Sequence, residues 1–156
     1  MHIRPADDRD APGMSGVLLD IIALTGRMRP HDEAFVRSHY ITNPDSIWCS
    51  IALDDDGMLG FQSLVRATPG NRYGVPQGWG IIGTHIRPRA HRRGVGTALF
   101  AASHHAAVQA GLSSIDASIG ADNPMGLRYY EAMGFRTYRE GDGIVQKMLT
   151  LPAQAR

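Results

Sequence analysis

The chain has 156 residues, of which 43% are hydrophobic and 20% are charged, and these figures predict one globular domain with a substantial core. A formal net charge of +1 argues against a protein that coats nucleic acid, because that function needs a broad basic surface. The single cysteine, Cys49, excludes an internal disulfide and suits a reducing compartment. The apolar stretch over residues 16–24 is far shorter than a membrane span and the N-terminus does not resemble a signal peptide, so we expect a cytoplasmic protein without a membrane partner.

The N-terminal third is expected to contain a short strand and two helices. The strand lies around Ile3, and apolar residues then recur at helical spacing over residues 11–22, with Gly26 placed to end that helix. A second helix is expected over residues 32–41, because Asn43-Pro44 is a stop signal.

Strands dominate the middle of the chain. Residues 47–53 alternate between apolar and more polar side chains, and the turn at residues 54–57 leads into a partner strand over residues 59–67. After a loop rich in glycine and proline, residues 79–86 are almost continuously apolar. This pattern predicts a central position in the sheet.

The remainder of the chain alternates between helices and strands. Asn123 is a suitable N-cap, Pro124 is preferred at a first helical position, and Gly134 can end a helix in the left-handed conformation. We expect a helix over residues 97–110, a strand over 114–119, a helix between Asn123 and Gly134, and strands over 135–138 and 144–151. The mixed order predicts an α/β sandwich with a largely antiparallel sheet.

The stretch from Arg87 to Phe100 joins a predicted strand to a predicted helix through arginines and two glycines. The amides of Gly94 and Gly96 lie at the helix N-terminus, where unpaired N–H groups and the helix dipole favour an anion such as phosphate. A Walker loop is excluded because no Gly-Lys-Ser/Thr triplet occurs, and a Rossmann loop because Leu99 occupies the position of the third glycine. A purely structural turn is the alternative.

Two motifs resemble those of one family. His91-Arg92-Arg93-Gly94-Val95-Gly96 fits the acetyl-CoA signature Arg/Gln-x-x-Gly-x-Gly/Ala except at its first residue, and so resembles motif A of the GNAT acetyltransferases. Residues 123–135 resemble motif B, in which an Asn opens a helix that ends in Tyr-Glu-x-x-Gly-Phe. The motifs and the predicted elements follow the family's order, so the resemblance covers nearly the whole chain.

The resemblance implies a three-layer α/β/α sandwich with a mixed, mostly antiparallel, splayed sheet of about six to seven strands, formed by residues 1–156 as a single N-acetyltransferase domain. It also implies transfer of an acetyl group from acetyl-CoA to a primary amine by direct attack on the thioester. The acceptor, a small molecule or a protein amine, cannot be identified from the sequence. A homodimer is a further expectation, because dimers are common in the family.

The resemblance also implies which residues bind acetyl-CoA. Backbone amides over residues 92–97 would hold the pyrophosphate, and the arginine side chains could reach the phosphates. The strand before the loop would pair with the pantetheine arm through its backbone. The expected cofactor-binding residues are Thr84, His85, Ile86, Arg92, Arg93, Gly94, Val95, Gly96, Thr97, Asn123 and Tyr130. We expect no metal, because no histidine pair has a ligand spacing.

Tyr130 is the candidate general acid. A phenol, with a pKa of about 10, can protonate a departing thiolate, and the matching tyrosine of the family often does so. Tyr129 falls where an apolar packing residue is usual. A structural or cofactor-contacting role is the alternative for Tyr130.

The general base is less evident. Some family members carry a Glu where this chain has Ser118. His85, at the end of the central strand, is the best titratable candidate, with packing alone as the alternative. Asp116 is a poorer candidate, because it is expected to alternate onto a different face.

Two other functions stay open at this level. The missing glutamate allows a non-catalytic acyl-CoA-binding sensor of the same fold, and the arginines near Gly94 allow a nucleic-acid binder, although no nucleic-acid partner is expected. Arg27, Arg29 and Arg72 lie in the segments that select the acceptor in the family, which we call the acceptor segments. These arginines suit an acidic acceptor or are simply solvated.

Overall fold

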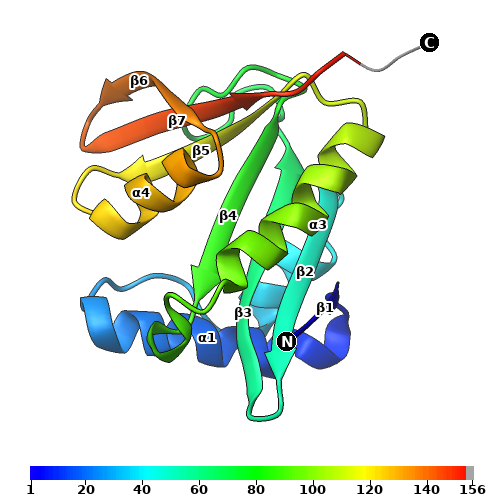
Figure 1. Cartoon of the computed structure of the whole chain (residues 1–156), viewed down its shortest axis with the longest axis vertical. Helices are drawn as coiled ribbons and strands as arrows, with labels where there is room; N and C mark the ends of the chain where they lie inside the picture. The colour runs from blue at the N-terminus through cyan, green and yellow to red at the C-terminus, as the bar shows by residue number, and fades with distance from the viewer. Residues whose placement is uncertain (154–156) are drawn as a thin grey trace.

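The described residues form a seven-stranded sheet with helices on both faces (Figure 1). The computed structural model describes residues 1–153, and residues 154–156 lie outside the described residues. Across the sheet the strands are β1 (His2–Pro5), β2 (Ser46–Asp54), β3 (Gly57–Arg66), β4 (Gly80–Ile86), β5 (Ser114–Gly120), β7 (Ile144–Thr150) and β6 (Arg136–Gly141).

The sheet is mostly antiparallel, because β4 and β5 are the parallel pair among antiparallel neighbours. β4 lies in the middle of the order, which confirms the central position predicted for residues 79–86. The predicted α/β sandwich is likewise confirmed.

The helices also follow the predicted order. They are α1 (Ala11–Thr25), α2 (Glu33–Val36), α3 (Val95–Gln109) and α4 (Pro124–Ala132), with short helical turns at Asp8–Asp10 (η1), Arg37–Ile41 (η2) and Pro88–Ala90 (η3). Asp7 caps η1, and α1 begins at Ala11, where the predicted helical spacing also begins. In contrast, α3 begins two residues earlier than expected, because Gly94 adopts the left-handed conformation and serves as its N-cap.

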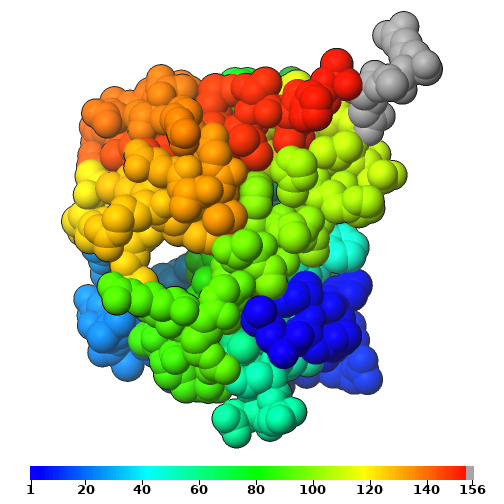
Figure 2. Space-filling view, in the orientation of Figure 1, coloured from blue at the N-terminus to red at the C-terminus, as the bar shows by residue number. Residues whose placement is uncertain are grey.

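β4 and β5 separate soon after they meet. Their pairing comprises Gly80 with Ile115 and Ile81 with Asp116, whereas β4 pairs with β3 along its whole length. Beyond Ile81, one edge of β4 therefore faces an opening instead of a neighbouring strand. Figure 2 shows an opening in the surface between α4 and the segment that follows β4.

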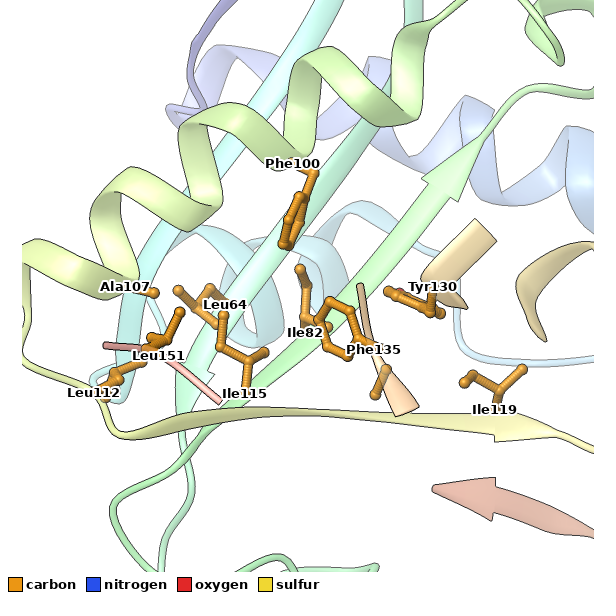
Figure 3. Packing of buried hydrophobic residues seen from close by; sticks show 11 residues of the cluster. Leu64, Ile82, Phe100, Ala107, Leu112, Ile115, Ile119, Tyr130, Phe135 and Leu151 are labelled. Atoms are coloured by element: carbon orange, nitrogen blue, oxygen red, sulfur yellow. The ribbon is translucent and has the colours of Figure 1, made fainter. Parts of the chain in front are cut away.

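Each face of the sheet has its own core. On one face, α1 and η2 pack against β2 and β3, with Phe61 at the centre of the cluster. On the other face, α3 and α4 cover β3, β4 and β5, and Figure 3 shows Phe100, Tyr130 and Phe135 in this cluster with Ile82. The rings of Tyr130 and Phe135 are 5.3 Å apart. Successive residues of β4 consequently point into two different environments.

A substitution at Phe135 tests how much the core under α3 and α4 contributes to the stability of the fold. The side chain is fully buried and contacts the rings of Phe100 and Tyr130. We expect Phe135→Ala to lower the free energy of unfolding in urea by about 3–5 kcal/mol, because lost burial and a cavity both destabilise. Leu19→Ala, at a position 46% exposed, is the control and should change it by less than about 1 kcal/mol. A similar small effect in both variants would contradict this account.

Candidate functional site

The N-terminus of α3 presents unpaired backbone amides. Gly94 has a φ of 77° and Arg92 a φ of 63°, so the chain turns sharply through left-handed conformations before the helix. The first helical hydrogen bond runs from the Ala98 N–H to the Gly94 carbonyl, at 3.1 Å. Within residues 1–153, the preceding amides of residues 95–97 have no backbone acceptor. This geometry suits an anion, since the helix dipole is positive here.

The arginines of the loop have different environments. The Arg87 guanidinium donates to the Met58 carbonyl at 2.7 Å and pairs with Asp20, so this residue holds α1 against β3 and β4. The guanidinium of Arg93 lies 3.1 Å from an Asp54 carboxylate oxygen. Arg92 is exposed beside the unpaired amides. Arg92 is therefore the arginine best placed to meet a phosphate without giving up a partner.

Gly96 allows α4 to approach the start of α3. A Cβ at Gly96 would lie 2.5 Å from a ring carbon of Tyr129, so any side chain there would collide with the tyrosine. The Tyr129 hydroxyl donates to the Gly96 carbonyl at 2.8 Å. Tyr129 was expected only to pack as an apolar residue would. Its hydroxyl also connects α4 to the loop through this hydrogen bond.

A buried glutamine continues this network. Gln62 on β3 is fully buried, and its Nε2 donates to the Tyr129 hydroxyl at 3.0 Å and to the Thr84 hydroxyl at 2.9 Å. Burial raises the pKa of Tyr129 to about 12, so its phenol stays protonated at neutral pH. Sequence reasoning did not single out Gln62. The available signal was a polar residue between Phe61 and Leu64 in a strand that is otherwise largely apolar.

Tyr130 lies beside Thr84, where β4 and β5 separate. The Tyr130 and Thr84 hydroxyl oxygens are 2.8 Å apart. Burial raises the pKa of Tyr130, which therefore also remains protonated at neutral pH. Thr84 already accepts a hydrogen bond from Gln62 and can donate its own proton to the phenol oxygen. In that arrangement the Tyr130 proton is available to a ligand.

His85 points to the opposite face of β4. Its Nε2 lies 3.4 Å from the Tyr40 hydroxyl, and its ring centroid is 4.7 Å from that of Phe61. Burial, together with the positive charge of Arg29 and the neighbouring His39, lowers the pKa of His85 to about 3. The imidazole is thus neutral at neutral pH and able to accept a proton, although its basicity is low.

A cavity of about 210 Å³ lies on this face, between η2 and strands β3 and β4. Its lining includes titratable, polar and apolar groups, from His39, Tyr40, Asn43, Ser63, Val65, Ile81, Ile82, Gly83 and His85. The cavity is the place where a second substrate could approach His85.

The carboxylate on β5 is already engaged. Asp116 is fully buried and accepts hydrogen bonds from the Tyr138 hydroxyl at 2.6 Å, the Ser118 hydroxyl at 2.8 Å and Gln146 Nε2 at 3.3 Å. It points away from the apolar neighbour Ile115, which faces the α3 side. Burial raises the pKa of Asp116. Because its oxygens are occupied, this carboxylate is less available than His85 for proton transfer.

The two sequence motifs meet in space. Asn123 caps α4, since its side chain accepts a hydrogen bond from the Gly126 N–H at 3.0 Å. The structure brings Tyr130 to Thr84 and, through Tyr129, connects α4 to the loop at Gly96. It does not place the His85 side chain in this group, because β4 itself lies between them.

Comparison with known proteins identifies the family of this chain. The model of the acetyltransferase (GNAT) family matches residues 18–135. The chain belongs to this family. No curated protein sequence is significantly similar to it.

Solved structures share the GNAT fold over nearly the whole chain. A GCN5-related N-acetyltransferase from Kribbella flavida has a TM-score of 0.76 and 22% identity, covering 96% of this chain and 97% of its own. The structure of yncA from Salmonella typhimurium, solved with its cofactor acetyl-CoA, has a TM-score of 0.73 and 18% identity. The match covers 99% of this chain and 96% of the yncA chain. The PaiA N-acetyltransferase from Thermoplasma acidophilum, in complex with coenzyme A, has a TM-score of 0.73 and 14% identity. The match covers 96% of this chain and 98% of the PaiA chain. At these identities the similarity concerns the fold.

Over residues 1–153, none of the helices has both the length and the apolar character that crossing a membrane requires. The same residues contain no group of three His, Cys, Asp or Glu side chains arranged to hold a metal ion.

The depressed pKa of His85 makes stability depend on pH. Between pH 3 and about 6.5, the unfolded chain binds a proton that folded His85 does not, so stability falls as the pH drops through this range. We expect His85→Gln to reduce the loss of unfolding free energy between about pH 7.5 and about pH 5 by on the order of 1 kcal/mol. Urea unfolding at both pH values measures this. His2→Gln, at an exposed position, is the control, and equal slopes in all three proteins would disprove the assignment.

Proposed function

We propose that this GNAT-family chain is an acetyl-CoA-dependent N-acetyltransferase that acts on a primary amine, with residues 1–156 forming a single domain. One observation carries the proposal. The unpaired amides after Gly94 are joined through Tyr129 to the helix that carries Tyr130, at the opening between β4 and β5. A candidate phosphate site and a buried proton donor thus belong to one connected group of residues.

The amides of residues 92–97 would bind the pyrophosphate, with Arg92 as the available guanidinium and Arg93 as a second after release of Asp54. The unpaired edge of β4 at residues 84–86 would pair with the pantetheine arm as an added strand. Asn123 would contact the cofactor from the start of α4, in addition to its capping role. These assignments follow from backbone groups that lack partners.

The two proposed proton transfers take place on opposite faces of β4. Acetyl-CoA supplies an acetyl group activated as a thioester. His85 would take the proton of an amine that approaches from the cavity, and Tyr130 would give its proton to the departing sulfur on the other face. As the new C–N bond forms, the C–S bond breaks, and a backbone amide on the open edge of β4 stabilises the oxyanion. No acyl-enzyme is required.

The decisive experiment measures free thiol while the protein is incubated with acetyl-CoA and a panel of amines. Amine-dependent thiol release that stops when the amine is omitted supports the transferase. Calorimetric binding of acetyl-CoA without turnover on any amine supports the acyl-CoA-binding sensor instead. Absence of acetyl-CoA binding would reject both functions.

Gly94 tests the phosphate site. A Cβ at Gly94 would have no atom within 4 Å apart from its chain neighbours, so we expect the side chain of Gly94→Leu to extend into the space that a ligand needs. We expect a loss of CoA affinity of at least about tenfold, measured by calorimetry. Gly143→Leu is the matched control, because Gly143 has a φ of 76° and equally open surroundings in the last hairpin. Both variants should lose a similar unfolding free energy, about 1–2 kcal/mol, and equal CoA affinities would reject the site.

Tyr130→Phe tests the general acid. The variant keeps the buried ring but removes the proton donor, so we expect kcat to fall at least about tenfold while the KM for acetyl-CoA changes little. Thiol release at saturating substrates measures the change. Tyr73→Phe is the control for loss of a phenol elsewhere in the chain, whose ring lies 5.0 Å from the Arg72 guanidinium. An unchanged kcat in a folded Tyr130→Phe variant would exclude the assignment.

A further inference from the structure

A cation, the Arg29 guanidinium, contacts Tyr40, one of the residues that line the cavity beside His85. Nη2 of Arg29 donates to the Tyr40 hydroxyl at 2.7 Å, and the same hydroxyl lies 3.4 Å from His85 Nε2. The guanidinium is therefore two hydrogen-bond lengths from the proposed base. Arg29 is also partly buried, which weakens the screening of its charge by water.

Arg29 differs from the other arginines of the expected acceptor segments. Arg27 forms an ion pair of 2.7 Å with Asp122, and the Arg72 guanidinium lies 5.0 Å from the centre of the Tyr73 ring. Within residues 1–153, no carboxylate lies within 4 Å of the Arg29 guanidinium. Its Nε donates to the Pro30 carbonyl, at 3.2 Å, which leaves Nη1 as a donor. The side chain is thus held in place with donor capacity unused.

The cavity itself contains no acidic group. Its lining is made of two histidines, a tyrosine and neutral side chains. The nearest carboxylate in the sheet register, Asp116, pairs with Ile81 and is already surrounded by three hydrogen-bond donors. An amine without an acidic group would therefore lie near the positive charge of Arg29 and meet no carboxylate among the lining residues.

The size of the cavity limits the occupant. About 210 Å³ lies below the roughly 300–1,000 Å³ of sites for drug-sized ligands. A small molecule fits this space, whereas a folded protein surface would reach His85 only through one narrow extended side chain.

We propose that this cavity binds a small amine that also carries an acidic group, a carboxylate or a phosphonate, and that Arg29 binds the acidic group while the amine lies at His85. The inference rests on the proposed acetyl transfer. The short path from Arg29 through Tyr40 to His85 requires the amine and the acidic group to be only a few bonds apart, as in an α-amino acid.

Binding of such a substrate would also make His85 a stronger base. The positive charge of Arg29 is, after burial, the next cause of the low pKa of His85. An acidic group paired with Arg29 neutralises that charge and allows the imidazole to accept the amine proton more readily. The substrate's own acid group would then contribute to the reaction as well as to recognition.

The test compares acceptors that differ only in charge. Thiol release from acetyl-CoA is measured with a panel of L-α-amino acids, with the matching α-amides and with 1-aminoethylphosphonate, the phosphonate analogue of alanine. We expect kcat/KM for at least one acidic amine to exceed that of its neutral analogue at least tenfold, and Arg29→Gln to remove this preference by lowering only the value for the acidic amine. The phosphonate arm shows which acidic group is preferred.

Matched variants control for nonspecific effects. Arg37→Gln removes an arginine of the same region, one that lies 3.6 Å from Glu33, and should leave the preference unchanged. Arg29→Lys keeps the positive charge and should restore part of it. Equal activity on acids and amides, or an equal effect of Arg29→Gln on both, would overturn the inference and leave the transferase intact.

Binding measurements separate the two proposals if no amine is acetylated. Acidic amines are then titrated into the complex of the protein with CoA. Saturable binding that is lost in Arg29→Gln would support the acidic-amine site even though the transferase proposal had failed. No binding to the wild-type protein would overturn the site as well.

Discussion

The separation of β4 from β5 is the constraint on which the site depends. After two paired positions, at Gly80 and Ile81, one edge of β4 has no neighbouring strand. Unpaired backbone groups in a protein interior are unfavourable unless water or a ligand satisfies them. The close-up in Figure 3 places the rings of Tyr130 and Phe135 in the region between these strands. The core thus supports an opening that a conventional parallel pair would have closed.

Alternation along β4 places different chemistry on the two sides of this opening. Thr84 and His85 are adjacent in sequence, but their side chains contact Tyr130 and Tyr40, which belong to helices on opposite faces. The proposed proton donor, Tyr130, and the proposed proton acceptor, His85, therefore do not contact each other. Gln62 extends the arrangement, because it joins Thr84 to Tyr129 and so to the N-terminus of α3.

Much of the fold was predictable because its boundaries depend on local chemistry. Asn123, Pro124 and Gly134 delimit α4 as expected, since capping, the first-turn proline and a left-handed glycine act within a few residues. The site was predictable only in part. Nothing near Gln62 in the sequence indicates that it lies beside Tyr129, because the two are 67 positions apart and meet only when α4 packs on the sheet.

The sequence alone determined the order of the elements, the prediction of a phosphate-binding loop at Gly94 and the family resemblance. These properties reside in short segments, where spacing and residue type are sufficient. Only the tertiary structure decided that Tyr129 closes on Gly96 and that Arg29 reaches His85 through Tyr40. Such contacts depend on strand register and on how each helix packs, and a one-residue shift in β4 would exchange the environments of Thr84 and His85.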